Sequence, residues 1–269
     1  MKLLSSQPIG IFDSGVGGLT VAHAIRQLLP RESIIYFGDT AHLPYGDKSA
    51  KSIIYYSRKI AGFLLEKKCK TIMVACNTAS AVAFKDLKEF LGEQVQLVNV
   101  IDPVTEYIGK GNYNKIGVIG TKGTINSGAY EKALKKNNTE YEVLSLATPL
   151  FVPMIEEGFI YDDISNAIIR SYLSDKSMKS IETLILGCTH YPIIKNQITK
   201  FFNFNIDVID SGRIVAEFVK CLLTEKNLLN TGKSQKDQFY ISDFTPFFER
   251  IAKMFFEDSI DLKKIDFWN

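Results

Sequence analysis

The chain has 269 residues, 46% of them hydrophobic and 23% charged, a balance typical of a globular protein with a substantial core. A formal net charge of +2, with lysines scattered rather than grouped, gives no basis for binding nucleic acid or an anionic membrane. No hydrophobic run approaches the roughly 20 residues that cross a bilayer, and residues 1–8 are too short and polar for a signal peptide, so we expect a cytoplasmic protein with reduced cysteines.

The first part of the chain alternates short hydrophobic runs with segments of helical periodicity. The predicted strands are residues 9–12, 33–37, 71–75 and 96–101, the last closed by Pro103. The predicted helices are residues 19–29, 49–65 and 79–91. Loops rich in glycine or polar residues follow the first two strands, at 13–18 and 38–46. Strands alternating with helices are typical of a parallel sheet covered by helices on both faces.

A second series of the same kind begins at residue 115. Its predicted strands are residues 115–119, 141–146, 183–186, 207–209 and 238–242. A helix is expected after the loop 120–124 through about residue 136, and another from about residue 193. The remaining predicted helices are residues 162–173, 211–223 and 244–256. Residues 151–158 are expected to form a loop or a short helix, and residues 226–236 a loose connection.

The two series resemble each other. Strand 9–12 and its glycine loop have a counterpart at 116–119, and Cys76 recurs as Cys188 at nearly the same interval along the chain. This pattern favours an α/β fold with two pseudo-symmetric lobes, each a mostly parallel sheet flanked by helices, and an active site in the cleft between them. We expect residues 1–101 and 210–269 to form the lobe with Cys76, and residues 102–209 the lobe with Cys188.

Cys76 and Cys188 each follow a buried strand, at the end of the sheet where open α/β folds bind ligands. A lone cysteine there is usually a small core residue, which is the interpretation we keep for Cys69 and Cys221. The paired placement favours function, because inverting a carbon centre needs one group to remove a proton and another to deliver one from the opposite face. Free cysteine has a pKa of about 8.5, so one thiol needs a lower value while the other stays protonated.

Two residues are candidates for adjusting these thiols. His190 lies two positions from Cys188 and could act as its acid–base partner. Asp13 ends the first strand of the lobe with Cys76, and its carboxylate could reach that thiol.

Further polar groups at the strand ends could bind a small carboxylate. The loop at 15–18 lacks the glycine pattern of a dinucleotide site and has no Gly-Lys-Ser/Thr, but its amides and Ser14 could hold an anion. The backbone of Tyr45 and Gly46, after Pro44, could close over a ligand. Glu156 could bind an ammonium group or lie in solvent. Other neutral donors, each of which could instead cap a helix, are Asn77, Thr78, Thr121, Thr124 and Thr189.

Five motifs together resemble those of bacterial glutamate racemases. They are IGIFDSGVGGLTV at 9–21, GDTAHLPYGDKS at 38–49, VACNTASA at 74–81, GTKGTINS at 120–127 and LGCTHYP at 186–192. The resemblance covers essentially the whole chain. It implies a homodimeric enzyme that interconverts L- and D-glutamate without a cofactor or metal and supplies D-glutamate for peptidoglycan.

The resemblance also implies roles for individual residues. Cys76 and Cys188 fall on the two acid/base positions, supported by Asp13, Glu156 and His190. The implied substrate-binding positions are Asp13, Ser14, Pro44, Tyr45, Gly46, Asn77, Thr78, Thr121, Thr124, Thr189 and His190.

Three alternatives remain open on the sequence. The first is a racemase of the same superfamily that acts on aspartate or another small acidic amino acid. The second is a hydrolase in which Cys76, Cys188, His190 and Asp13 bind zinc. The third is a two-lobed binding protein that performs no chemistry.

Overall fold

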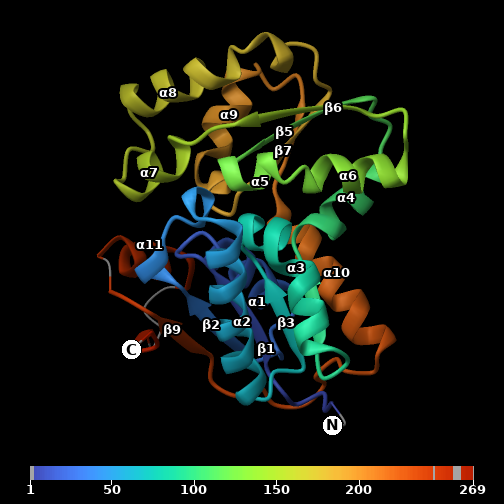
Figure 1. Ribbon diagram of the computed structural model, residues 1–269, viewed down its shortest axis with the longest axis vertical. Helices are drawn as coiled ribbons and strands as arrows, with labels where there is room; N and C mark the ends of the chain where they lie inside the picture. The colour runs from blue at the N-terminus through green and yellow to red at the C-terminus, as the bar shows by residue number, and fades with distance from the viewer. Residues whose placement is uncertain (1–2, 245, 257–261, 269) are drawn as a thin grey trace.

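The computed structural model describes residues 3–244, 246–256 and 262–268, and it contains two sheets flanked by helices, one in each half of the molecule (Figure 1). Every strand pairing in both sheets is parallel. The first sheet has the order β10-β9-β2-β1-β3-β4, and its strands are β1 (Ile9–Asp13), β2 (Ile34–Gly38), β3 (Thr71–Val74), β4 (Gln96–Asn99), β9 (Gln238–Ile241) and β10 (Leu262–Lys264). The second has the order β6-β5-β7-β8, and its strands are β5 (Lys115–Gly120), β6 (Glu142–Ala147), β7 (Thr183–Gly187) and β8 (Asp207–Ile209). The predicted fold class is confirmed.

The order of the strands repeats between the two sheets. The unit β2-β1-β3-β4 of the first corresponds strand by strand to β6-β5-β7-β8 of the second. By this correspondence β3 and β7 are equivalent, and these are the strands that lead to Cys76 and Cys188. The boundaries of the lobes, after residues 101 and 209, stay a prediction.

Helices cover both sheets on both faces, which explains why the central strands are continuous hydrophobic runs. They are α1 (Leu19–Leu28), α2 (Ala50–Glu66), α3 (Asn77–Leu91), α4 (Ile101–Gly109), α5 (Lys122–Asn126), α6 (Ala129–Asn137), α7 (Phe151–Glu156), α8 (Asp163–Leu173), α9 (Lys195–Phe201), α10 (Ser211–Glu225) and α11 (Pro246–Phe256). Short 3₁₀ turns lie at η1 (Thr40–His42), η2 (Tyr45–Asp47), η3 (Lys176–Met178) and η4 (Tyr191–Ile194).

The segment after β4 differs from the prediction. We expected a strand to residue 101 closed by Pro103, but β4 ends at Asn99 and α4 begins at Ile101. Oδ1 of Asn99 accepts hydrogen bonds from the amides of Ile101 and Asp102, both at 2.8 Å, which turns the chain into the helix. Pro103 lies in the first turn, where a helix does not need its missing N–H.

Two further differences concern short elements. The single helix expected through residue 136 is divided into α5 and α6 at Gly128, whose φ of 64° is a left-handed conformation that glycine adopts readily. Strand β10 was not predicted, because Leu262–Lys264 is short and two-thirds lysine. It extends the first sheet at its edge, where lysine is common.

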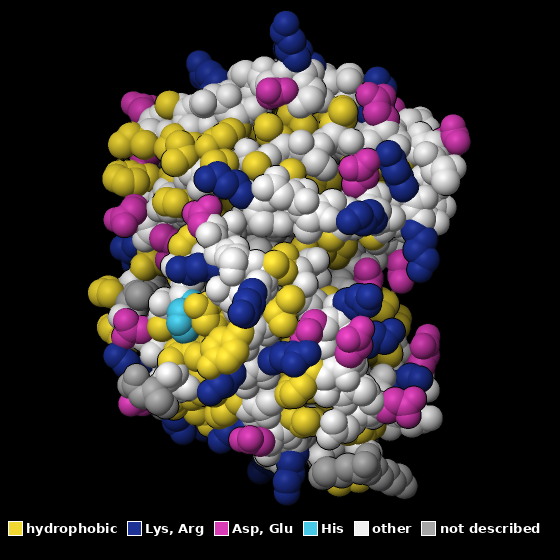
Figure 2. All heavy atoms as spheres, viewed as in Figure 1, with side chains coloured by type: hydrophobic (Ala, Val, Ile, Leu, Met, Phe, Trp, Pro, Cys, Tyr) yellow, Lys and Arg dark blue, Asp and Glu magenta, His cyan; other side chains and the backbone are white. Residues whose placement is uncertain are grey.

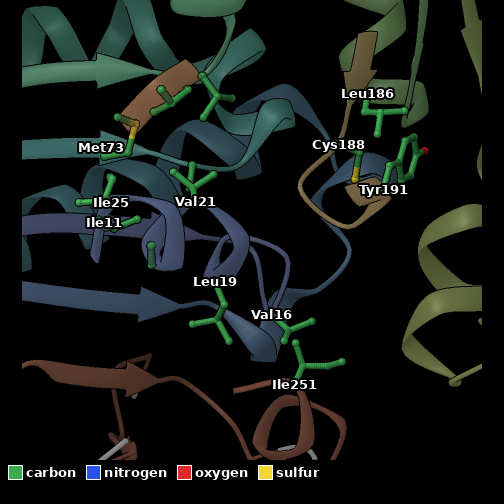
Figure 3. Packing of buried hydrophobic residues seen from close by; sticks show 14 of the residues in the cluster. Ile11, Val16, Leu19, Val21, Ile25, Met73, Leu186, Cys188, Tyr191 and Ile251 are labelled. Carbon is green, nitrogen blue, oxygen red and sulfur yellow. The ribbon is translucent and has the colours of Figure 1, made fainter. Parts of the chain in front are cut away.

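The hydrophobic core supports the ends of β3 and β7. One cluster joins Ile11 and Met73 of the first sheet to Leu186 of the second, and to Cys188 and Tyr191 just after it (Figure 3). A separate cluster beneath α2 and α3 contains Cys76. Each cysteine is therefore held against closely packed hydrophobic side chains.

One face of the molecule shows both charges mixed. On the face seen in Figure 2, Lys and Arg side chains are interspersed with Asp and Glu over both halves of the molecule. Within the described ranges, every helix is too short or too polar to cross a bilayer.

Candidate active site

Cys76 and Cys188 line the same small cavity. Its lining comes from both halves of the chain and consists of Ser14, Leu43, Pro44, Tyr45, Gly46, Cys76, Asn77, Thr78, Thr121, Val152, Cys188, Thr189 and His190. Most predicted site residues are therefore brought together. Asp13, Thr124 and Glu156 do not line the cavity but contact residues that do. Leu43 and Val152 were not singled out, because an apolar lining residue leaves no signal in the sequence.

Cys76 stands at the N-cap of α3. Its Sγ accepts a hydrogen bond from the amide of Ala79 at 3.4 Å, and its thiol donates to Oγ of Ser14 at 3.7 Å. Burial, and then the nearby charge of Asp13, raise the pKa of Cys76 to about 12, against the smaller effect of these two contacts. At neutral pH the thiol is therefore protonated and suited to donate a proton.

This state of Cys76 predicts its reactivity. Alkylation by iodoacetamide should become about tenfold faster with each pH unit from about pH 7 to about pH 10, without levelling off, because only the thiolate reacts. Peptide-resolved mass spectrometry would measure it, with exposed Cys221 as the control for reagent access. A plateau at or below about pH 8.5 would contradict the assignment.

Asp13 connects the two halves of the site. Its carboxylate is fully buried, accepts the amide of Gly15 at 3.0 Å through Oδ2, and accepts the hydroxyl of Thr189 at 3.2 Å through Oδ1. Burial raises the pKa of Asp13, although His190 and the hydrogen bonds oppose this. We expected Asp13 to reach Cys76. Instead its side-chain hydrogen bonds go to Gly15 and Thr189, and its influence on that thiol is through charge.

His190 lies between Cys188 and Glu156. Its Nδ1 is 3.8 Å from Sγ of Cys188, and its Nε2 is 2.5 Å from Oε1 of Glu156. Burial by itself lowers the pKa of His190, but the hydrogen bonds with Cys188 and Glu156 outweigh it and hold the pKa well above its usual value. The imidazole thus lies directly between the sulfur of Cys188 and the carboxylate of Glu156. Glu156, at the end of α7, is thus directed to His190 rather than into the cavity.

Three threonine hydroxyls meet where α3 faces α5. Oγ1 of Thr78 lies 2.9 Å from that of Thr121 and 3.2 Å from that of Thr124. The backbone of η2 approaches closely at the same place, since a Cβ on Gly46 would lie 2.5 Å from Cβ of Thr121. Only glycine fits at this contact between the two halves.

Asn77 offers a donor to a ligand. Its Oδ1 accepts the hydroxyl of Tyr130 at 2.6 Å, and its buried Nδ2 has no hydrogen-bond partner among the described residues. An unsatisfied buried donor is costly, so a carboxylate bound in the cavity would be stabilised by this amide.

The described residues contain no group of three His, Cys, Asp or Glu side chains arranged to hold a metal ion. The four residues of the hydrolase alternative, Asp13, Cys76, Cys188 and His190, therefore do not form a ligand set.

Comparison with known proteins gives consistent results. The sequence profile of the Asp/Glu/hydantoin racemase family matches residues 18–219. The chain is 43% identical to the glutamate racemase of Geobacter metallireducens over 92% of each chain, and 43% identical to that of Aquifex aeolicus over 95% of this chain and 96% of the other. The crystal structure of glutamate racemase from Francisella tularensis in complex with D-glutamate is similar with a TM-score of 0.92, at 40% identity over 98% of this chain and 99% of that one.

Proposed function

The chain belongs to the Asp/Glu/hydantoin racemase family and interconverts L- and D-glutamate, and we propose that it does so by direct proton transfer between the substrate and two cysteines. The observation that carries this mechanism is the placement of Cys76 and Cys188 on one cavity, after equivalent strands of the two sheets. A thiolate on one face removes the proton from Cα, leaving a carbanion. The thiol on the other face then protonates the same carbon, which inverts it.

We assign different starting states to the two cysteines. Cys188, beside protonated His190, starts as the thiolate in one direction, and Cys76 starts as the thiol. After one turnover the proton has moved, so that Cys188 carries it and Cys76 is ionised. Substrate of the opposite configuration then reacts through the reverse sequence. Glu156 acts on this exchange through its hydrogen bond with His190. Asp13 acts on it through its negative charge near Cys76.

The substrate's charged groups meet mainly neutral donors. Hydroxyls and amides hold carboxylates without adding a permanent charge to a buried site. We assign this role to Ser14, Asn77, Thr78, Thr121, Thr124 and Thr189 and to the backbone amides of Tyr45 and Gly46. Pro44, which has no N–H, borders the substrate, His190 adds a charged donor, and Asp13 acts through Thr189.

The proposal also covers where the enzyme acts, how it assembles and what its product is used for. Proton transfer by thiols requires reduced cysteines, which supports a cytoplasmic location. There the enzyme would act as a homodimer without a cofactor and supply D-glutamate for peptidoglycan.

The proposal predicts that the purified protein, with no cofactor added, brings L-glutamate and D-glutamate to the same racemic mixture. Circular dichroism of the amino acid would follow each reaction to zero signal. In D₂O, exchange of the α-proton should be much faster for glutamate than for aspartate, and a chelator should leave the rate unchanged. Binding without loss of signal would favour a binding protein. Activity abolished by the chelator would favour a metal-dependent enzyme.

A further inference from the structure

The buried carboxylate of Asp39 stands at the start of the loop that supplies Pro44, Tyr45 and Gly46 to the cavity. Inside this loop it accepts the hydroxyl of Tyr45 at 2.7 Å and lies 2.9 Å from Nδ1 of His42. The side chain of Asp39 therefore links two other residues of the loop to its first residue.

The same carboxylate accepts two donors from the C-terminal part of the chain. Oγ of Ser242, directly after β9, donates to Oδ1 at 2.8 Å, and Nε1 of Trp268 donates to the same oxygen at 2.8 Å. These residues lie more than 200 positions from Asp39 in the sequence. The extension of the first sheet through β9 and β10 thus reaches the loop that borders the cavity.

Ring contacts hold Trp268 in place. Its ring centroid is 4.6 Å from that of His42 and 5.2 Å from that of Tyr56, and His42 itself stacks on Tyr56 at 3.9 Å. The neighbouring Phe267 packs on Phe37 of β2 with ring centroids 4.7 Å apart. The C-terminal tail, residues 265–268, is thereby fixed to the core independently of the hydrogen bond to Asp39.

The loop tolerates little displacement at the cavity. Gly46 is in such close contact with Thr121 that a Cβ would not fit, and Tyr45 is almost completely buried. A shift of the loop would therefore move the groups that border the substrate. We infer that Asp39 and Trp268 are positioning residues for glutamate binding: through Asp39, the C-terminal tail sets the place of the Pro44–Tyr45–Gly46 segment. This inference rests on the proposed function of the cavity.

Two variants test the inference. Trp268→Phe keeps an aromatic ring but removes the N–H donor, and Asp39→Asn keeps the shape but removes the charge that draws the donors together. Each should raise KM for D-glutamate about three- to tenfold while changing kcat by less than about twofold, since the loop holds substrate but transfers no proton. The matched control is Lys264→Ala, which removes an exposed contact with Asp243 that does not involve Asp39 and should leave both constants unchanged.

A spectroscopic measurement tests the same inference without relying on reaction rates. Trp268 is the single tryptophan of the chain, so its fluorescence reports directly on the tail. D-glutamate should change this emission in the wild-type protein with half-saturation near KM, and the response should disappear in Asp39→Asn.

The results separate the inference from the proposed function. A wild-type protein that racemises glutamate, together with Trp268→Phe and Asp39→Asn variants that keep its KM, would overturn the inference alone. A lower melting temperature with unchanged KM would do the same, since it would assign the tail a purely structural role. A wild-type protein that does not racemise glutamate would overturn the proposed function.

Discussion

The Cys76→Ser and Cys188→Ser variants are each expected to lose racemisation almost completely, with kcat lowered by about 10³-fold or more in both directions. Inversion needs a base on one face of Cα and an acid on the other, so neither cysteine can replace its partner. A serine hydroxyl is a much weaker acid than a thiol and forms no useful base at neutral pH. The circular dichroism assay with each enantiomer would measure the loss.

Proton exchange in these variants gives a finer readout. Each variant keeps one working thiol, so in D₂O the α-proton should exchange from only one enantiomer, and the two variants should differ in which one. Cys221→Ser, at an exposed position, is the matched control and should retain the wild-type kcat. Equal residual turnover in both directions in either active-site variant would contradict the two-base mechanism.

The Lys70→Met variant is expected to lose about 3–5 kcal/mol of unfolding free energy, because it leaves a buried carboxylate without its partner. Nζ of Lys70 lies 2.5 Å from Oε2 of Glu32 and donates to the carbonyls of Ser5 at 2.5 Å and Leu228 at 2.8 Å. Lys70 and Glu32 are both almost fully buried. Burial lowers the pKa of Lys70, opposed by Glu32. Urea denaturation followed by far-UV circular dichroism would measure the change.

A double variant identifies the cause. Oε1 of Glu32 also accepts the amide of Asn230 at 2.8 Å, so Glu32→Gln keeps an acceptor there while removing the charge. Lys70→Met combined with Glu32→Gln should therefore recover most of the lost stability. The pair lies at the amino end of β3 and Cys76 beyond its carboxyl end, so kcat per folded molecule should not change in either variant. A double variant no more stable than Lys70→Met would show that lost packing, not an unpaired charge, is responsible.

The parts of the fold that local sequence determines could be predicted. The strands before Cys76 and Cys188 are hydrophobic runs ended by small and polar residues, so their positions and parallel arrangement follow from pattern alone. The start of α4 could not be predicted, because it depends on the side chain of Asn99 turning back on two amides. Strand β10 has little hydrophobic character and is held by its pairing with β9.

In the site, too, features set by the local sequence could be predicted and features set by distant contacts could not. The cysteines and the hydroxyl residues after the strands could be predicted, because strand ends carry them to one edge of each sheet. The direction of Glu156 toward His190 and the contacts of Ser242 and Trp268 with Asp39 could not, since each depends on segments distant in sequence. Nothing in the local pattern around Trp268 indicates a partner in the loop after β2.

The repeated strand order makes the two lobes alike, yet among the described residues only the first sheet continues, through β9 to β10. The faces presented to Cα are consequently unequal in their support as well as in their charged neighbours. Enantiomers have the same free energy in an achiral solvent, so the equilibrium constant is unity and kcat/KM must be identical for the two directions. If the unequal faces make the enzyme bind one enantiomer more tightly, KM and kcat must therefore change together. The enantiomer with the lower KM is also the one with the lower kcat.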